Sequence, residues 1–165
     1  MRHFRFVLLL PLLLCASCYS FTGASLPPHI KSIAVPIFGD ESRSGVLQLR
    51  EKFTAKMIEK VQGRSGLLLV QDRAASASVL ECVVTGYTNS PSVVSGPTER
   101  ATQNRITLGL TATYRDLVKS KKLFEQSFNA FADYPIGNLS EQQLAIDKAI
   151  DNATEDVFNK MVSGW

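Results

Sequence analysis

The side chains with the greatest potential for chemistry are three cysteines, Cys15, Cys18 and Cys82. Cys15 and Cys18 form a C-x-x-C pair, a spacing that can supply half of a zinc site, form a disulfide or simply leave two thiols. A zinc site needs further ligands, and the chain offers no second cysteine pair and only two histidines. The sequence therefore predicts no metal site and no cofactor. Cys82 lies in the apolar run VLECVV, where a lone thiol behaves as a small apolar side chain, so we expect it in the core.

The sequence also lacks the groups that most enzymes use. His3 and His29 both precede the expected domain, which leaves no histidine inside it to act as a general base. The chain contains no G-x-S-x-G, no glycine-rich phosphate loop and no H-E-x-x-H. Asp151, Glu155 and Asp156 fall in adjacent turns of an expected helix, where a solvated face is their ordinary role. We expect no catalytic residues and no enzymatic activity.

The N-terminal segment has the order of a secretory signal. A charged start, MRHFR, precedes an apolar run over residues 6–14, and small residues follow. The run is too short for a membrane-spanning helix, which needs roughly 20 apolar residues, and Pro11 interrupts it. We therefore predict a signal peptide over residues 1–17, a lipidated leader over residues 18–29 and a single domain over residues 30–165.

The segment Cys15-Ala16-Ser17-Cys18 resembles the lipobox of bacterial lipoproteins. In that motif small residues precede a cysteine that is acylated and becomes the first residue of the mature protein. The resemblance assigns lipidation to Cys18, with Cys15 in the position that usually holds leucine. The acyl chains would anchor the protein stably in a membrane, because each CH₂ group that they bury contributes roughly 0.8 kcal/mol to the free energy of membrane binding. Tyr19, rather than an aspartate, is compatible with sorting to the outer membrane by the rule that such lipoproteins follow.

Charge is distributed unevenly along the chain. The net charge of +3 falls to +1 without Arg2 and Arg5 of the signal peptide, so bulk charge gives no reason to expect nucleic acid as a partner. Residues 100–122 hold six basic side chains and one acidic one, Asp116, whereas residues 123–165 hold two basic and seven acidic side chains. One region can therefore attract anions while the molecule stays nearly neutral.

The apolar periodicity predicts which elements position these charges. Residues 46–61 carry apolar side chains at spacings of three and four, which indicates an amphipathic helix. Short apolar strands are expected around residues 29–38, 67–73 and 79–88, followed by a polar loop or ragged strand end over residues 89–104. A last helix is expected to begin with a capping box at Ser140 and to run nearly to Trp165.

The clearest alternation lies between Arg105 and Tyr134. Ile106, Leu108, Leu110 and Ala112 alternate with threonines and a glycine, and the tip KSKK over residues 119–122 joins this strand to a second one. Together the elements predict an α+β fold, with two helices packed on one face of a mixed, mostly antiparallel sheet of about four to five strands.

The order of these elements resembles that of the LptE family of lipopolysaccharide-assembly lipoproteins. The resemblance rests on the opening CYSFTGASLPPHIKSIAVPIF, the helix, the VLECVVTGY strand and the long hairpin, and it covers the whole mature chain. It implies an outer-membrane lipoprotein on the periplasmic side, a plug within the LptD β-barrel, and lipopolysaccharide as a ligand. The basic residues in or beside the comparable hairpin are then the candidate lipopolysaccharide-binding residues: Arg105, Arg115, Lys119, Lys121 and Lys122.

Two alternatives stay open at this stage. The first half, from IAVPIF to VLECVV, also resembles periplasmic lipoprotein domains that activate peptidoglycan synthases or join other envelope assemblies, and such domains bind protein surfaces rather than lipid. The KSKK tip, for its part, can be a solvated turn whose lysines discourage edge-to-edge pairing, whereas arginine and lysine can equally grip lipid phosphates.

Overall fold

The computed structural model describes residues 26–95 and 100–163, so the expected signal peptide and Cys18 lie outside the described residues. Three long strands form an antiparallel meander: β4 (Ser78–Ser95), β5 (Arg100–Asp116) and β6 (Lys121–Pro135). Three short strands are added in parallel: β1 (Ser32–Ala34) and β2 (Gly39–Asp40) on β4, and β3 (Leu68–Leu69) on β1. The sheet order is β3-β1-β4-β5-β6, with β2 also paired with β4.

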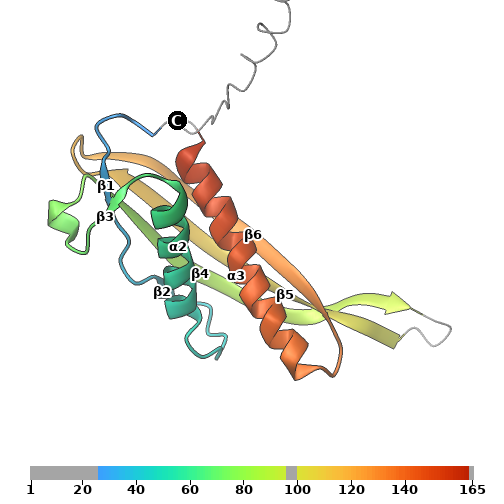
Figure 1. Cartoon of the computed structure of the whole chain (residues 1–165). Coiled ribbons are helices and arrows are strands. Elements are labelled where there is room, and N and C mark those ends of the chain that lie inside the picture. The colour runs from blue at the N-terminus through green and yellow to red at the C-terminus, as the bar shows by residue number, and fades with distance from the viewer. Residues whose placement is uncertain (1–25, 96–99, 164–165) are drawn as a thin grey trace, which may run out of the picture.

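Two helices, α2 (Leu49–Arg64) and α3 (Leu139–Val162), lie side by side on one face of this sheet (Figure 1). A short 3-10 helix, η2 (Arg73–Ala75), connects β3 to β4. The α+β prediction is confirmed, with helices on one face of a mixed, mostly antiparallel sheet. The described sheet has six strands, one more than the four to five expected, because the two residues of β2, where no strand was expected, pair with β4.

The core lies between the helices and the sheet. The face of β5 predicted from its alternation is buried, from Ile106 to Ala112, and Tyr114 continues it without exposure. Cys82 of β4 is buried among apolar side chains, as predicted, and burial raises the pKa of its thiol. From α3, apolar side chains at helical spacing complete the core: Ile146, Ala149, Ile150, Ala153, Val157 and Met161.

The polar segment over residues 89–104 is mostly strand rather than loop. Ser90 pairs with Arg105 and Pro91 with Asn104, and the register shifts just after Pro91, so the proline lies at an irregularity where a strand tolerates it. The Asn89 and Asn104 amides donate to the Tyr134 hydroxyl at 2.7 and 3.2 Å. These side-chain bonds tie β4, β5 and β6 together, a long-range effect that the local polar composition does not reveal.

Both helices begin at other residues than predicted. The first starts at Leu49 rather than Val46, because Gln48 adopts a left-handed backbone conformation with φ 59°. The second is capped by Asn138, whose side chain accepts a hydrogen bond from the Glu141 N–H at 3.1 Å. Ser140 is therefore inside the first turn, and the predicted capping box at that residue is wrong by two positions.

Candidate functional site

The five candidate basic residues all lie on the β5–β6 hairpin, but the structure divides them into two groups. Arg115, Lys119, Lys121 and Lys122 gather at the turn between the strands. Arg105 is ten residues before Arg115 on the same strand, which corresponds to about 33 Å at the usual rise per residue. Four of the five candidate residues thus lie together at the turn, whereas Arg105 lies far from them. We call the four residues at the turn the tip cluster.

A hydrogen bond between His29 and a buried carboxylate fixes the turn that carries the tip cluster. Asp116, the lone acid of this region, is only 2% exposed, and its carboxylate accepts a hydrogen bond from His29 Nε2 at 2.5 Å. Its second oxygen accepts from the Lys119 N–H at 2.9 Å. Burial opposes the charge of this carboxylate, yet the bonds from His29 and the turn outweigh burial, so the pKa of Asp116 lies below its ordinary value.

Sequence reasoning missed this pair. It placed His29 in the leader, outside the domain, whereas the imidazole contacts the end of β5 and is partly covered. Asp116 lies on the same buried face of β5 as Ile106 and Tyr114, because every second residue of a strand points to the same side. This spacing in the sequence could have indicated that its side chain is buried. The hydrogen bond joins two residues 87 positions apart.

Half of the tip cluster is neutralised by neighbouring acids. Lys122 Nζ lies 2.6 Å from Glu125 Oε2, and Arg115 Nε lies 3.6 Å from Glu81 Oε2. Within the described part of the chain, Lys119 and Lys121 have no acidic partner, and both are exposed. The turn therefore presents at least two uncompensated ammonium groups to solvent, as an anion-binding surface requires.

Arg105 is engaged with its own strand partner. Its guanidinium donates to both carboxylate oxygens of Asp133 at 2.7 and 2.8 Å and stacks on the Phe131 ring at 4.1 Å from the centroid. The hydrogen bonds from Arg105 lower the pKa of Asp133. The register counted from the turn does not reveal this pair, because the shift between Tyr114 and Arg115 places Asp133 one position further from the turn than Arg105. To bind a phosphate, Arg105 would have to share or leave its carboxylate partner.

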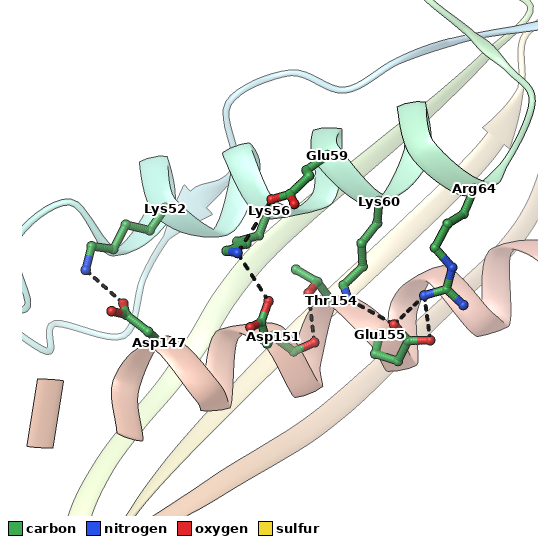
Figure 2. A network of polar contacts seen from close by, with 9 residues as sticks. All are labelled: Lys52, Lys56, Glu59, Lys60, Arg64, Asp147, Asp151, Thr154 and Glu155. Carbon is green, nitrogen blue, oxygen red and sulfur yellow. Dashed lines mark hydrogen bonds and ion pairs between the residues drawn. The ribbon is translucent and has the colours of Figure 1, made fainter. Parts of the chain in front are cut away.

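A second polar region lies between the two helices, where a groove of about 380 Å³ is lined mainly by charged side chains. Figure 2 shows basic residues of α2 facing acidic residues of α3 in matching order. Lys52 Nζ lies 2.8 Å from Asp147 Oδ1, and Lys60 Nζ lies 2.9 Å from Glu155 Oε2. The acids expected on a solvated face thus partly join the helices, and the groove offers charges that are already paired rather than a nucleophile or a base.

Acid should weaken this helix contact through Glu155. Hydrogen bonds from Arg64 and then Lys60 lower the pKa of Glu155 from 4.5 to about 2. A carboxylate with a lowered pKa in the folded state stabilises above its unfolded pKa, so this contribution is complete above about pH 5 and is lost as pH falls toward 2. We expect Glu155→Gln to remove about 1 kcal/mol at neutral pH, because solvent screening of a partly exposed pair reduces the full effect of the shift.

Urea unfolding between pH 7 and pH 3 measures this prediction. The variant should show a shallower loss of stability with acid than the unmodified protein. Asp156→Asn is the matched control, since Asp156 is exposed and has no cationic partner among the residues described. An identical pH dependence in the Glu155→Gln protein would contradict the assignment.

Other kinds of site are not found in the described ranges. No group of three or more histidine, cysteine or acidic side chains there could hold a metal ion. None of the helices over residues 26–95 and 100–163 has the length and apolar character needed to cross a bilayer.

Comparisons with known proteins agree with the architecture. The chain is similar in fold to rare lipoprotein B from Shewanella oneidensis, with 12% identity, a TM-score of 0.57, and coverage of 80% of this chain and 94% of that one. It is also similar to a minor lipoprotein from Acinetobacter baumannii (14% identity, TM-score 0.52, 81% and 94% coverage) and to the PelC dodecamer from Paraburkholderia phytofirmans (8%, 0.54, 86% and 94%). At such identities the likeness establishes the fold alone. No curated protein matches the sequence.

The family comparison is more specific than these likenesses. The LptE model, described as lipopolysaccharide-assembly, matches residues 30–161, which contain every strand described above, all of α2 and all of α3 except its last residue. The match confirms the resemblance from the first strand through the hairpin to the last helix, and the leader over residues 18–29 lies outside it. The chain therefore belongs to the LptE lipopolysaccharide-assembly family.

Proposed function

We propose that the mature chain is a non-enzymatic lipoprotein of the outer membrane, anchored through Cys18 on the periplasmic side. In this proposal it lodges as a plug within an LptD-like β-barrel and binds lipopolysaccharide while the pair transports it and inserts it into the outer leaflet. The observation that carries the proposal is the family match over residues 30–161. Membership in a family of lipopolysaccharide-assembly lipoproteins supports an envelope role without catalysis.

One structural feature supports insertion into a partner. The ends of β4 and β5 project beyond both helices as a two-stranded ribbon (Figure 1). Since β6 ends at Pro135, opposite Gln103, residues 93–95 and 100–102 have no third strand beside them in the described sheet. We call these two segments the ribbon arm. A two-stranded ribbon is at best marginally stable alone in water, so a surrounding partner would stabilise it.

Capture from outer membranes in mild detergent tests the barrel partnership. The full-length protein should recover a large β-barrel protein that mass spectrometry identifies. A matched variant replaces residues 94–102 with Asn-Gly, which closes Val93 and Gln103 with a two-residue hairpin turn. That variant should keep its circular dichroism spectrum and recover much less barrel. Recovery of a peptidoglycan synthase instead of a barrel would favour the alternative function.

The tip cluster supports lipopolysaccharide binding, because lipid A phosphates are anions that lysine and arginine can grip. Replacing Lys119, Lys121 and Lys122 with glutamate should weaken lipopolysaccharide binding by at least tenfold at low salt, with a smaller difference at high salt. Titration of the purified protein with lipopolysaccharide at two salt concentrations measures this. Arg105→Glu and Arg115→Glu test the two remaining candidates separately, and unchanged binding in the triple variant would mean that the three lysines do not bind lipopolysaccharide.

A further inference from the structure

The leader enters the fold beside the tip cluster. Leu26 packs against the core, Ile30 is buried, and the Ile30 N–H donates to the Pro27 carbonyl at 2.9 Å. The contact of His29 with Asp116 then holds the leader against the end of β5. Figure 1 shows the start of the described chain, β1, β3 and the β5–β6 turn at the same end of the molecule. We call the surface formed by residues 26–31, 67–68 and 115–122 the leader end.

Positive charge dominates the leader end. Lys31 joins the four basic residues of the tip cluster, while the single acid within these ranges, Asp116, is buried and bonded to His29. Lys31, Lys119 and Lys121 have no acidic partner in the part of the chain that the structure describes. The electrostatic potential outside this surface is therefore suited to an anionic partner.

Apolar side chains project from the same surface. Val118, between Leu117 and Lys119 in the turn, is 63% exposed, and Leu68 of β3 is 68% exposed. Leu68 lies beside Lys31, since its N–H donates to the Lys31 carbonyl at 3.0 Å. Exposed aliphatic side chains, each next to a lysine, are typical of surfaces that meet both the headgroups and the upper acyl region of a bilayer.

The proposed lipid anchor would keep this surface close to a membrane. Cys18 is eight residues before Leu26, so the intervening chain can span at most about 29 Å. A tether this short gives the leader end a high effective concentration at the bilayer surface. Electrostatic attraction between the lysines and anionic lipids extends over about 8 Å at physiological ionic strength. The basic surface must therefore face the bilayer directly to be attracted to it.

We propose that the leader end docks on anionic phospholipids of the leaflet that holds the anchor, with Val118 and Leu68 at the acyl boundary and Lys31, Lys119 and Lys121 on the phosphates. This inference rests on the lipid anchor of the proposed function, but not on the barrel or on lipopolysaccharide. Free phosphate shares the ligand chemistry but offers no acyl boundary.

A fluorophore on the turn tests the contact. Val118→Cys in the full-length lipidated protein is labelled with an environment-sensitive dye, while buried Cys82 remains unlabelled. Leu144→Cys, which is similarly exposed on the first half of α3, carries the same dye as the control. The proteins are reconstituted into neutral phosphatidylcholine vesicles, vesicles with added phosphatidylglycerol, and neutral vesicles with added lipopolysaccharide, each with and without spin-labelled headgroups as quenchers.

Phosphatidylglycerol should shift the emission of the dye at position 118 to the blue and make it accessible to the quencher, with no change at position 144. Replacing Lys119, Lys121 and Lys122 with glutamine should lower the docking equilibrium constant about a hundredfold, because each basic residue near an anionic surface contributes about a factor of five. High salt should act in the same direction.

Several results would overturn the proposal. They include equal quenching at both positions, equal quenching in neutral vesicles, and no effect of the three glutamines. A response that requires lipopolysaccharide would assign the turn to that lipid and not to the anchoring leaflet. The protein mass reports the acyl chains independently, and their absence would remove the tether. Inorganic phosphate at the concentration of the lipid headgroups should leave the dye unchanged, and capture of the barrel is measured separately.

Discussion

Replacing Phe53 with alanine is expected to lower the free energy of unfolding by about 3–5 kcal/mol, the range for deleting a large buried aromatic side chain. Phe53 is 2% exposed and packs its ring edge-to-face against Phe38, with the centroids 5.0 Å apart. It also borders a small internal space together with Val84 of β4, Leu108 of β5 and Ile150 of α3. One truncation therefore removes contacts to both helices and the sheet at once.

Thermal and urea unfolding of the purified protein measure this effect. For a chain of this length the midpoint should fall by about 10 °C. Phe131→Ala is the matched control, because that ring is half exposed and its main contact is the Arg105 guanidinium, so the loss should stay near 1 kcal/mol. Equal losses in the two variants would mean that the core does not converge on Phe53.

The elements that the sequence predicted correctly are those in which one side of the chain meets water and the other meets the core. The alternation from Ile106 to Ala112 predicts a strand with one buried face, and that face packs under the helices. The spacing through Phe53, Met57 and Val61 predicts the buried stripe of the first helix in the same way. In both cases the signal repeats over several residues, so no single long-range contact decides the outcome.

The errors occurred where a contact between distant residues decides the structure. The polar residues next to Asn89 in the sequence predict a loop. Its side-chain amide nevertheless donates to Tyr134, 45 positions away, and the segment pairs as a strand. His29 was predicted to lie in the leader, outside the domain, but its imidazole bonds to the buried carboxylate of Asp116 at the end of β5. Periodicity contains no information about such pairs. Even a hairpin register counted from the turn would pair Arg105 with Ala132, because the register shift between Tyr114 and Arg115 is what moves its partner to Asp133.

The candidate site was predicted in the same uneven way. Its chemistry, a set of basic side chains suited to phosphate, follows from composition alone, because residues 100–122 are so rich in lysine and arginine. Its geometry does not follow from composition. Arg105 is separated from the turn by the length of a strand and is satisfied by Asp133, whereas Lys31, far away in sequence, is carried to the leader end by β1. Sheet topology therefore determines which charges act together.

Replacing Cys18 with alanine should abolish lipidation, and it is the substitution expected to have the largest effect on location. The lipobox resemblance makes this thiol the acyl acceptor, and neither other cysteine follows two small residues: Leu13 and Leu14 precede Cys15, and Leu80 and Glu81 precede Cys82. The acyl chains would supply most of the membrane affinity, because burying each CH₂ of an acyl chain contributes roughly 0.8 kcal/mol to it. Mass spectrometry of the purified protein should therefore show loss of all acyl mass.

Cys15→Ala is the matched control, because it removes the other cysteine of the same C-x-x-C and leaves a small apolar residue in the position where a lipobox usually has leucine. This variant should be processed and acylated normally. Acyl mass retained by the Cys18→Ala protein, or lost from the Cys15→Ala protein, would move the mature N-terminus away from Cys18. The tether would then differ in length or be absent, so the same two variants also test the physical basis for holding the tip cluster near the bilayer.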